Sequence, residues 1–278
     1  MWSRLSRTAG RRAFGRDPAA YDAARPEYPA RLFSILQSRC GLQPGARVLE
    51  IGGGTGLATR EMLRRGAAHV TVVEPDRRLA RYLVRSLGRD RTKVTVVGST
   101  FEAARLPRGG FDLGASATAF HWLDERRALR KVARLLRPGG WWAAWWNVYG
   151  DPLHPSPFQR AIDPMFHGLP SGPSTPIRSR LPHALDRAAR ERALRRTGQF
   201  RRISSLILRR SIDLPSARLA ALYATYAPIA TLPLARRRRF LEGLIGVADT
   251  EFRGRVGMRV ITPLYTAQRV PHGPVRGD

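Results

Sequence analysis

VLEIGGGTG, at residues 48–56, is the stretch that decides the predicted fold of this 278-residue chain. It is a short apolar run that ends in a glycine-rich turn, and a segment typical of a helix follows it. A second apolar run, VTVVEPD at residues 70–76, ends in the acidic residue Glu74. This order of strand, glycine turn, helix, strand and acid is typical of a βαβ unit that binds a nucleotide-containing ligand. The sequence therefore predicts an α/β fold with a mostly parallel sheet.

The spacing of the glycines narrows the choice of ligand. A dinucleotide-binding turn needs G-x-G-x-x-G, but here Leu57 stands where the third glycine would be. The helix expected over Leu57–Arg65 offers unpaired N–H groups at its N-terminus, which suit a carboxylate as well as a phosphate. Glu74 is placed to accept hydrogen bonds from both hydroxyls of a ribose. The alternative is a plain turn beside a solvated glutamate.

Further strands are expected at residues 93–97, 111–116 and 141–146, with a turn at residues 137–140. At this point the chain resembles class I methyltransferases that use S-adenosylmethionine, whose first motif, E-x-G-x-G-x-G, matches Glu50 to Gly56. More narrowly, it resembles the type 11 family, which includes relatives of trans-aconitate methyltransferase. The resemblance is good over residues 14–147 and looser beyond them.

The resemblance implies S-adenosylmethionine as the cofactor. It assigns to the cofactor site Tyr21, Arg25, Glu50, Gly52, Gly54, Thr55, Gly56, Glu74, Pro75, Thr100, Phe101 and Ser116. Thr100 and Phe101 would flank the adenine, although Phe101 could equally be a core residue. Tyr21 and Arg25 would close on the methionyl end as part of a lid. Alternatively, the Arg-Pro and Tyr-Pro pairs of this segment only punctuate an extended stretch.

His121 is the candidate catalytic residue. Methyl transfer depends on holding the nucleophile, the methyl carbon and sulfur in line, and a general base helps only if the acceptor must lose a proton early. His121 follows the fourth expected strand, where the methyl group is expected, and it could serve as that base. The alternative is a histidine that lines the pocket or is hydrogen-bonded beside Trp122. The expected reaction is methyl transfer to a small molecule at an oxygen or a carboxylate.

Two other functions remain open: an RNA or DNA methyltransferase, and a non-catalytic cofactor-binding protein that acts through partners. The formal charge of +28 invites a nucleic-acid partner. However, Lys93 and Lys131 are the only lysines among 49 basic residues, and the arginines are spread along the whole chain. This pattern favours coding bias over a phosphate-binding surface, so nucleic acid is not expected as a partner. The arginine-rich composition of the expected cap would suit an anionic acceptor.

Other classes of protein are also not expected. Cys40 is the single cysteine, which excludes an intramolecular disulfide and a cysteine-based metal site, and no metal is expected. No apolar run approaches the length needed to cross a bilayer. A cytoplasmic protein without a membrane partner is therefore predicted.

The organisation expected is a single domain over residues 1–278. Residues 14–45 would form the lid, 46–147 the cofactor-binding core, and 148–278 a helical cap with the closing strands. Late strands at residues 200–214 and 259–269 would form the antiparallel edge hairpin of a Rossmann-like, seven-stranded methyltransferase sheet. Helices within residues 151–198 and 215–252 would cap the crevice at the carboxyl ends of the strands.

Overall fold

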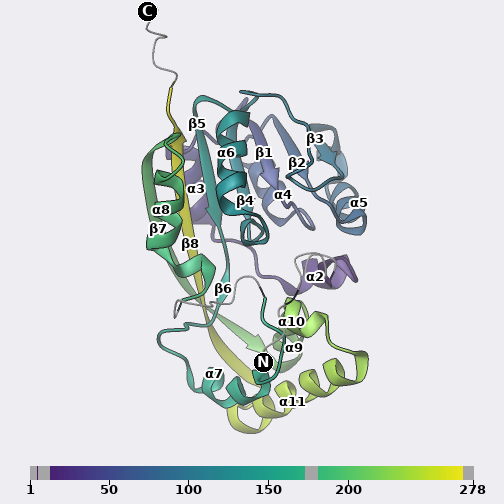
Figure 1. Ribbon diagram of the computed structural model, residues 1–278. Coiled ribbons are helices and arrows are strands. Elements are labelled where there is room, and N and C mark those ends of the chain that lie inside the picture. Colours follow the sequence, from purple (N-terminus) through teal and green to yellow (C-terminus); the bar gives the residue numbers. More distant parts are fainter. Residues whose placement is uncertain (1–4, 6–12, 173–180, 272–278) are drawn as a thin grey trace, which may run out of the picture.

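A twisted sheet of eight strands organises the molecule (Figure 1). The computed structural model describes residue 5, residues 13–172 and residues 181–271. Five strands run parallel in the order β3-β2-β1-β4-β5, β8 joins β5 antiparallel, and β6 and β7 both pair antiparallel with β8. The strands are β1 (Arg47–Ile51), β2 (His69–Val73), β3 (Val94–Val97), β4 (Phe111–Ala117), β5 (Leu136–Trp145), β6 (Val148–Tyr149), β7 (Phe200–Pro215) and β8 (Arg255–Arg269). The expected mostly parallel sheet with an antiparallel edge hairpin is confirmed, and β6 is an additional short strand.

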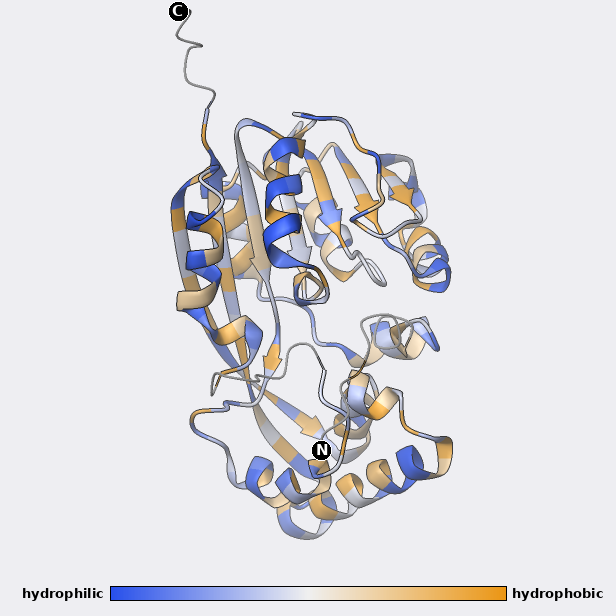
Figure 2. Ribbon diagram, viewed as in Figure 1, coloured by the Kyte–Doolittle hydropathy of each residue, from blue (hydrophilic) through white to orange (hydrophobic). Residues whose placement is uncertain are grey.

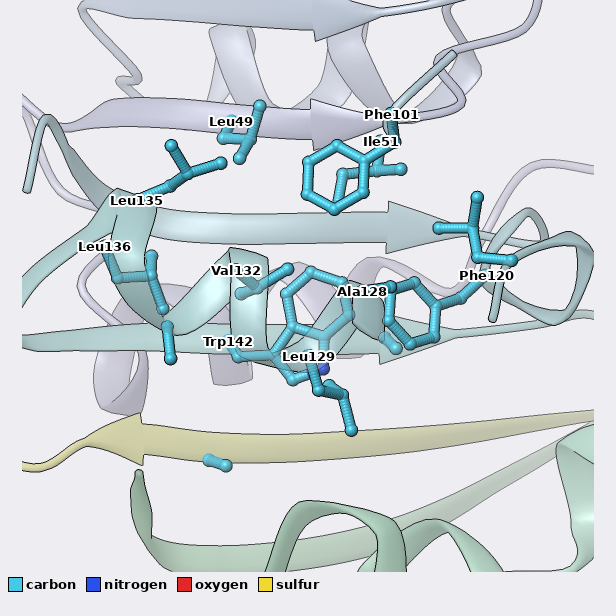
Figure 3. Close-up of a cluster of buried hydrophobic side chains, with 14 of the residues drawn as sticks. Leu49, Ile51, Phe101, Phe120, Ala128, Leu129, Val132, Leu135, Leu136 and Trp142 are labelled. Atoms are coloured by element: carbon cyan, nitrogen blue, oxygen red, sulfur yellow. The ribbon is translucent and has the colours of Figure 1, made fainter. Parts of the chain in front are cut away.

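Helices cover both faces of the parallel part of the sheet. On one face lie α3 (Ala30–Arg39), α4 (Leu57–Arg64) and α5 (Arg77–Ser86), which share an apolar cluster with β1 and β2. On the other face lie α6 (Glu125–Leu135) and α8 (Arg187–Arg195). There Leu129 and Val132 of α6 pack against Trp142 of β5 (Figure 3). Figure 2 shows that α6 turns a hydrophilic side outward, as an amphipathic surface helix does.

The cap is a second layer of helices at the carboxyl ends of the parallel strands (Figure 1). Its helices are α7 (Pro157–Ile162), α9 (Ser216–Ala224), α10 (Ala227–Ala230) and α11 (Leu234–Phe252). They enclose a separate apolar cluster, to which β8 contributes Val256 and Met258. The 3₁₀ helices of the described residues are η1 (Gly88–Lys93), η2 (Phe120–Trp122), η3 (Asp163–Phe166) and η4 (His183–Leu185). None of the helices in the described ranges has the length and apolar character needed to cross a bilayer.

Two expectations, for residues 187–195 and for residues 137–140, are wrong. The helix at residues 187–195 is not part of the cap, because its Leu194 packs in the sheet-side cluster with Leu129 and its Arg190 pairs with Glu125 of α6 at 2.8 Å. The turn expected at residues 137–140 lies inside β5. The strand begins at Leu136, opposite Phe111, and accommodates the glycines as an irregularity in register, with Gly139 at φ +77°.

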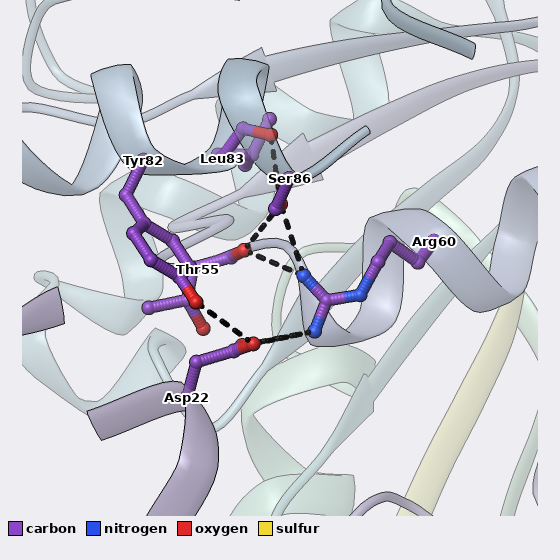
Figure 4. A network of polar contacts seen from close by, with 6 residues as sticks. All are labelled: Asp22, Thr55, Arg60, Tyr82, Leu83 and Ser86. Atoms are coloured by element: carbon purple, nitrogen blue, oxygen red, sulfur yellow. Dashed lines mark hydrogen bonds and ion pairs between the residues drawn. The ribbon is translucent and has the colours of Figure 1, made fainter. Parts of the chain in front are cut away.

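Helix α2 (Pro18–Ala24), in the segment predicted to form the lid and called the lid below, lies between the core and the cap. Figure 4 shows how it is fastened to the core: the Arg60 guanidinium of α4 donates to both oxygens of Asp22, at 2.9 and 3.1 Å. Arg60 also donates to the carbonyl oxygen of Thr55 in the glycine turn, and the Tyr82 hydroxyl donates to Asp22. On the cap side, Arg16 donates to the carbonyl oxygen of Ala230 at 2.8 Å. The lid is therefore bound to both layers.

The loop after β3 is held by the ammonium group of Lys131 on α6. The Nζ atom donates to the carbonyl oxygens of Phe101, Glu102 and Ala104, at 2.6, 3.1 and 2.6 Å, and lies 5.0 Å from the centre of the Phe101 ring. A compact ammonium with three donors suits three converging carbonyls, whereas the planar guanidinium of arginine does not. Burial lowers the pKa of Lys131.

We expect Lys131→Met to lower the free energy of unfolding by about 2 kcal/mol, because hydrogen bonds from a charged donor are lost while the carbonyls stay partly buried. Lys131→Arg should recover only part of this loss. Urea unfolding measures both. The chain's other lysine provides the control: Lys93 forms an exposed pair with Asp90, so Lys93→Met should change stability by less than about 0.5 kcal/mol. Equal effects at the two lysines would contradict this account.

Candidate active site

A cavity of about 510 Å³ lies where the carboxyl ends of β1, β2 and β4 meet the lid and the cap. This is the edge at which open α/β sheets bind ligands. Its lining comes from the glycine turn, the loops after β2, β3 and β4, the lid segment and residues 226–228 of the cap. The volume is typical of a small-molecule site.

The glycine turn forms one wall. Gly52, at φ +74°, donates from its N–H to the carbonyl oxygen of Val73, and a Cβ added there would collide with Ala119. Gly54, at φ +58°, is different, because a Cβ added there would meet no atom within 4 Å. Both backbones are therefore in the left-handed region that favours glycine. Because Gly54 lines the cavity, a side chain at this position would occupy space meant for a ligand.

Glu74 stands at the end of β2 and is 5% exposed. Its two carboxylate oxygens accept hydrogen bonds from the backbone N–H groups of Gly54 and Asp76, each at 2.9 Å. These bonds fix the carboxylate at the cavity wall, and a carboxylate oxygen can accept more than one hydrogen bond. Pro75, Thr100 and Phe101 line the cavity beside Glu74, which is the arrangement expected around a ribose and an adenine.

Glu50, the last but one residue of β1, is a buried carboxylate at 1% exposure. The Thr59 hydroxyl donates to its Oε2 atom at 2.5 Å, whereas Oε1 has no hydrogen-bond partner among the described residues. Burial raises the pKa of Glu50 to about 7, against the opposing effect of the Thr59 hydrogen bond. The Thr55 hydroxyl, also on the cavity wall, is likewise buried without a partner in the described structure. Unsatisfied buried oxygens of this kind mark a place for a polar ligand.

Arg25 lines the cavity from the segment around α2, among aromatic rings. Its guanidinium carbon is 5.1 Å from the centre of the Tyr21 ring and 5.3 Å from those of Tyr149 and Tyr226. One of its nitrogens donates to the carbonyl oxygen of Thr225 at 3.2 Å. Burial by itself lowers the pKa of Arg25, but the three phenol groups outweigh it and the net pKa is raised, so the charge persists. Within the described residues, the Arg25 Nε atom and the Tyr226 hydroxyl have no hydrogen-bond partner.

His121 lies on η2, just past β4, and lines the cavity. The Trp146 indole N–H donates to its Nδ1 atom at 3.0 Å. The ring centres of His121 and Trp122 are 5.2 Å apart, and those of His121 and His183 are 6.2 Å apart. His183 is in close contact with Arg190, and burial, Arg190 and His121 together lower the pKa of His183 to about 2. His121 thus both lines the cavity and accepts a hydrogen bond from Trp146.

The structure brings most of the predicted cofactor residues to one cavity. Ser116 does not line it, because its hydroxyl is buried in the sheet and donates to the carbonyl oxygen of Ile51 at 2.9 Å. Gly56 does not line it either, since it forms the N-cap of α4 just behind the wall. Within the described part of the chain, no cluster of histidine, cysteine and acidic side chains could hold a metal ion.

Several lining residues were not predicted. They include Tyr28, Thr118, Trp146, Asn147, Tyr149 and Tyr226. Tyr28 and Thr118 join the lid to the loop after β4 through a 3.0 Å hydrogen bond between their hydroxyls. A signal was available for Tyr28, which lies in the same short segment as Arg25. Tyr149 and Tyr226 reach the site only through the tertiary fold.

Comparison with known proteins agrees with this geometry. Residues 48–140 match the family described as "Methyltransferase domain". An uncharacterized methyltransferase of Mycobacterium tuberculosis is 35% identical over 141 residues, which are 51% of this chain and 54% of the relative. The chain thus spans about half the length of the curated relatives it matches.

Two solved structures share the fold. One is a proposed type II methyltransferase from Anaeromyxobacter dehalogenans, with a TM-score of 0.59, 22% identity, and coverage of 89% of this chain and 99% of that one. The other is phosphoethanolamine N-methyltransferase 2 of Haemonchus contortus in complex with S-adenosyl-L-methionine, with a TM-score of 0.55, 15% identity, and coverage of 94% and 60%.

Residues 48–140 thus match a methyltransferase domain, and the fold is that of class I S-adenosylmethionine-dependent methyltransferases. S-adenosylmethionine is the cofactor of this class. The narrower likeness to relatives of trans-aconitate methyltransferase stays a prediction.

The residues at the glycine end of the cavity fit this cofactor. Glu74 would accept the ribose hydroxyls, and the unpaired Oε1 atom of Glu50 would accept from the cationic amino group of the methionyl moiety. The space at Gly54 leaves room for a ligand to approach the backbone closely.

We expect Gly54→Val to abolish binding of S-adenosylhomocysteine in calorimetric titration, because the valine side chain would fill ligand space. Strain from the left-handed backbone, about 1–2 kcal/mol, is a second effect of the change. Gly88→Val separates the two effects. Gly88 has φ +53° and open space around its Cβ, but it lies outside the cavity, so that variant should bind normally. If Gly54→Val binds S-adenosylhomocysteine normally, the cofactor does not bind at the wall formed by the glycine turn.

The affinity for S-adenosylhomocysteine should rise about tenfold between pH 6 and pH 8. Glu50, with a pKa raised to about 7, is mostly protonated at pH 6, and pairing with a ligand ammonium requires the ionised form. Binding near neutral pH must then release a proton, which calorimetry detects as a dependence of heat on the buffer. Glu50→Gln should bind more weakly and with no pH dependence over this range. If the affinity of Glu50→Gln has the same pH dependence as that of the unaltered protein, a group other than Glu50 causes it.

Proposed function

We propose that this protein transfers a methyl group from S-adenosylmethionine to a small-molecule acid, at a carboxylate oxygen. The observation that carries the proposal is the distribution of charge in the cavity. Its two acidic side chains, Glu50 and Glu74, stand beside the glycine turn, while the cation of Arg25 reaches the cavity among Tyr149 and Tyr226. An acceptor that binds beside Arg25 is therefore expected to carry a negative charge.

The surroundings of Arg25 favour the acceptor over the methionyl carboxylate as its partner. Thr225, Tyr149 and Tyr226, which contact Arg25, belong to the cap side of the cavity rather than to the glycine turn. No carboxylate of the described residues forms an ion pair with this buried cation, and the orphan Nε atom leaves a donor for a ligand. A planar guanidinium matches a carboxylate through paired hydrogen bonds.

A carboxylate acceptor also needs no general base. The cofactor supplies an electrophilic methyl group: a carboxylate lone pair forms the new O–C bond, the electrons of the broken C–S bond stay on sulfur, and no proton has to move. Residues of the cavity would bind and orient the acceptor and exclude water. A cytoplasmic location and the absence of nucleic acid among the substrates are parts of the same proposal.

The first test is calorimetric titration with S-adenosylhomocysteine and with NAD, each at two salt concentrations. We expect binding of S-adenosylhomocysteine alone. Carboxylic acids, alcohols, amines and an RNA mixture are then offered with radiolabelled S-adenosylmethionine. Label in base-labile esters of an acid supports the proposal, whereas label in RNA with strongly salt-dependent binding supports the nucleic-acid alternative. Cofactor binding without transfer to any acceptor supports a non-catalytic protein.

Arg25→Met should raise the KM for the acid at least about 30-fold, corresponding to roughly 2 kcal/mol for a lost buried charge pair. Affinity for S-adenosylhomocysteine should change little. Arg16→Met is the matched control, because Arg16 lies in the same lid segment but does not line the cavity. If Arg25→Met instead weakens S-adenosylhomocysteine but not methylthioadenosine, which lacks the carboxylate, Arg25 binds the methionyl end.

A further inference from the structure

The hydrogen bond between Trp146 and His121 determines which nitrogen of the histidine carries the proton. An indole N–H can only donate, so the Nδ1 atom that receives it at 3.0 Å must present its lone pair. A neutral imidazole ring has one proton, and here that proton must be on Nε2. Any hydrogen bond that the neutral ring makes through Nε2 is therefore one in which the ring donates.

The groups packed around the ring also disfavour adding a second proton. Protonating Nδ1 would break the Trp146 hydrogen bond and leave the indole N–H, on a residue 4% exposed, without its acceptor. His183 faces the ring from η4, and behind it stands the positive charge of Arg190. The carboxylate behind these groups, Glu125 of α6, is already paired with Arg190 at 2.8 Å.

We propose that Trp146 is a positioning residue that holds His121 as a neutral, Nε2-protonated hydrogen-bond donor, so that His121 does not act as a general base. The consequence of this inference for catalysis rests on the proposed function. The acceptor must then arrive as a nucleophile from which His121 removes no proton. An ionised carboxylate meets that condition, and an alcohol or a phenol does not.

The protonated nitrogen is measurable without any activity. We would label the histidines with ¹⁵N and record two-bond ¹⁵N–¹H correlation spectra at pH 8. The chain has six histidines, and the signal of His121 is identified by its loss in His121→Gln. We expect the Nε2–H tautomer, with a hydrogen-bonded Nδ1. An Nδ1–H tautomer in the unaltered protein would overturn the proposal.

Two tryptophan variants make this measurement specific. In Trp146→Phe the ¹⁵N resonance of Nδ1 should move to the value of a nitrogen without a hydrogen bond. Trp145→Phe is the matched control, because Trp145 is equally buried but its indole N–H has no hydrogen-bond partner in the described structure. It also does not line the cavity. An Nδ1 resonance unchanged in Trp146→Phe, or changed equally in both variants, would contradict the assignment.

Kinetics distinguishes a donor from a base. A glutamine amide can donate a hydrogen bond but cannot accept a proton at neutral pH. We expect His121→Gln to keep kcat within about tenfold of the unaltered enzyme and His121→Ala to fall well below it. A general base contributes roughly 10²–10⁴-fold, so an equal loss of that size in both variants would overturn the proposal.

The two proposals fail in different ways. If no acceptor is methylated by the unaltered protein, the proposed function fails, while the tautomer measured in the spectra still decides the state of His121. Binding of S-adenosylhomocysteine by both His121 variants checks that each is folded.

Discussion

The ladder between β7 and β8 is the interaction on which the rest of the molecule depends. Strand β8 pairs with β7 along nearly its whole length, and its C-terminal half also pairs with β5. Its N-terminal half carries Val256 and Met258 into the apolar cluster of the cap. One continuous pair of strands therefore extends from the parallel sheet into the cap (Figure 1). The cap thereby sits at a fixed place above the carboxyl ends of the strands, where the cavity forms.

The cavity separates charges of opposite sign within a largely apolar enclosure. Glu50 is kept from ionising fully because burial penalises its charge, whereas Arg25 stays charged because three aromatic rings and a carbonyl group replace water around it. Under the proposed function, the ammonium group of the cofactor would pair with Glu50 and the carboxylate of the acceptor would pair with Arg25. The two molecules would then be held in one orientation.

The sequence was sufficient for the parts of the site that are local in the chain. The glycine turn and Glu74 follow directly from consecutive strands, and the fold class follows from the order of those strands. The environment of Arg25 could not be predicted, because Tyr149 and Tyr226 are far away in sequence. The same holds for the contact between His121 and Trp146, which depends on the register of β4 and β5. Ser116 was assigned to the cofactor site by the family resemblance, but its hydroxyl donates to the carbonyl oxygen of Ile51 within the sheet.

The cap helices α9, α10 and α11 are inserted between two strands that are neighbours in the sheet. The insertion leaves β7 at Pro215 and returns to β8 at Arg255, and its ends meet where the Ser216 N–H donates to the carbonyl oxygen of Gly254 at 2.9 Å. A segment whose ends lie side by side can be lengthened, shortened or exchanged without disturbing the strands that carry it. Residues 216–254 thus form an exchangeable module. Changes within it can alter this wall of the cavity while the glycine turn and Glu74 keep their places.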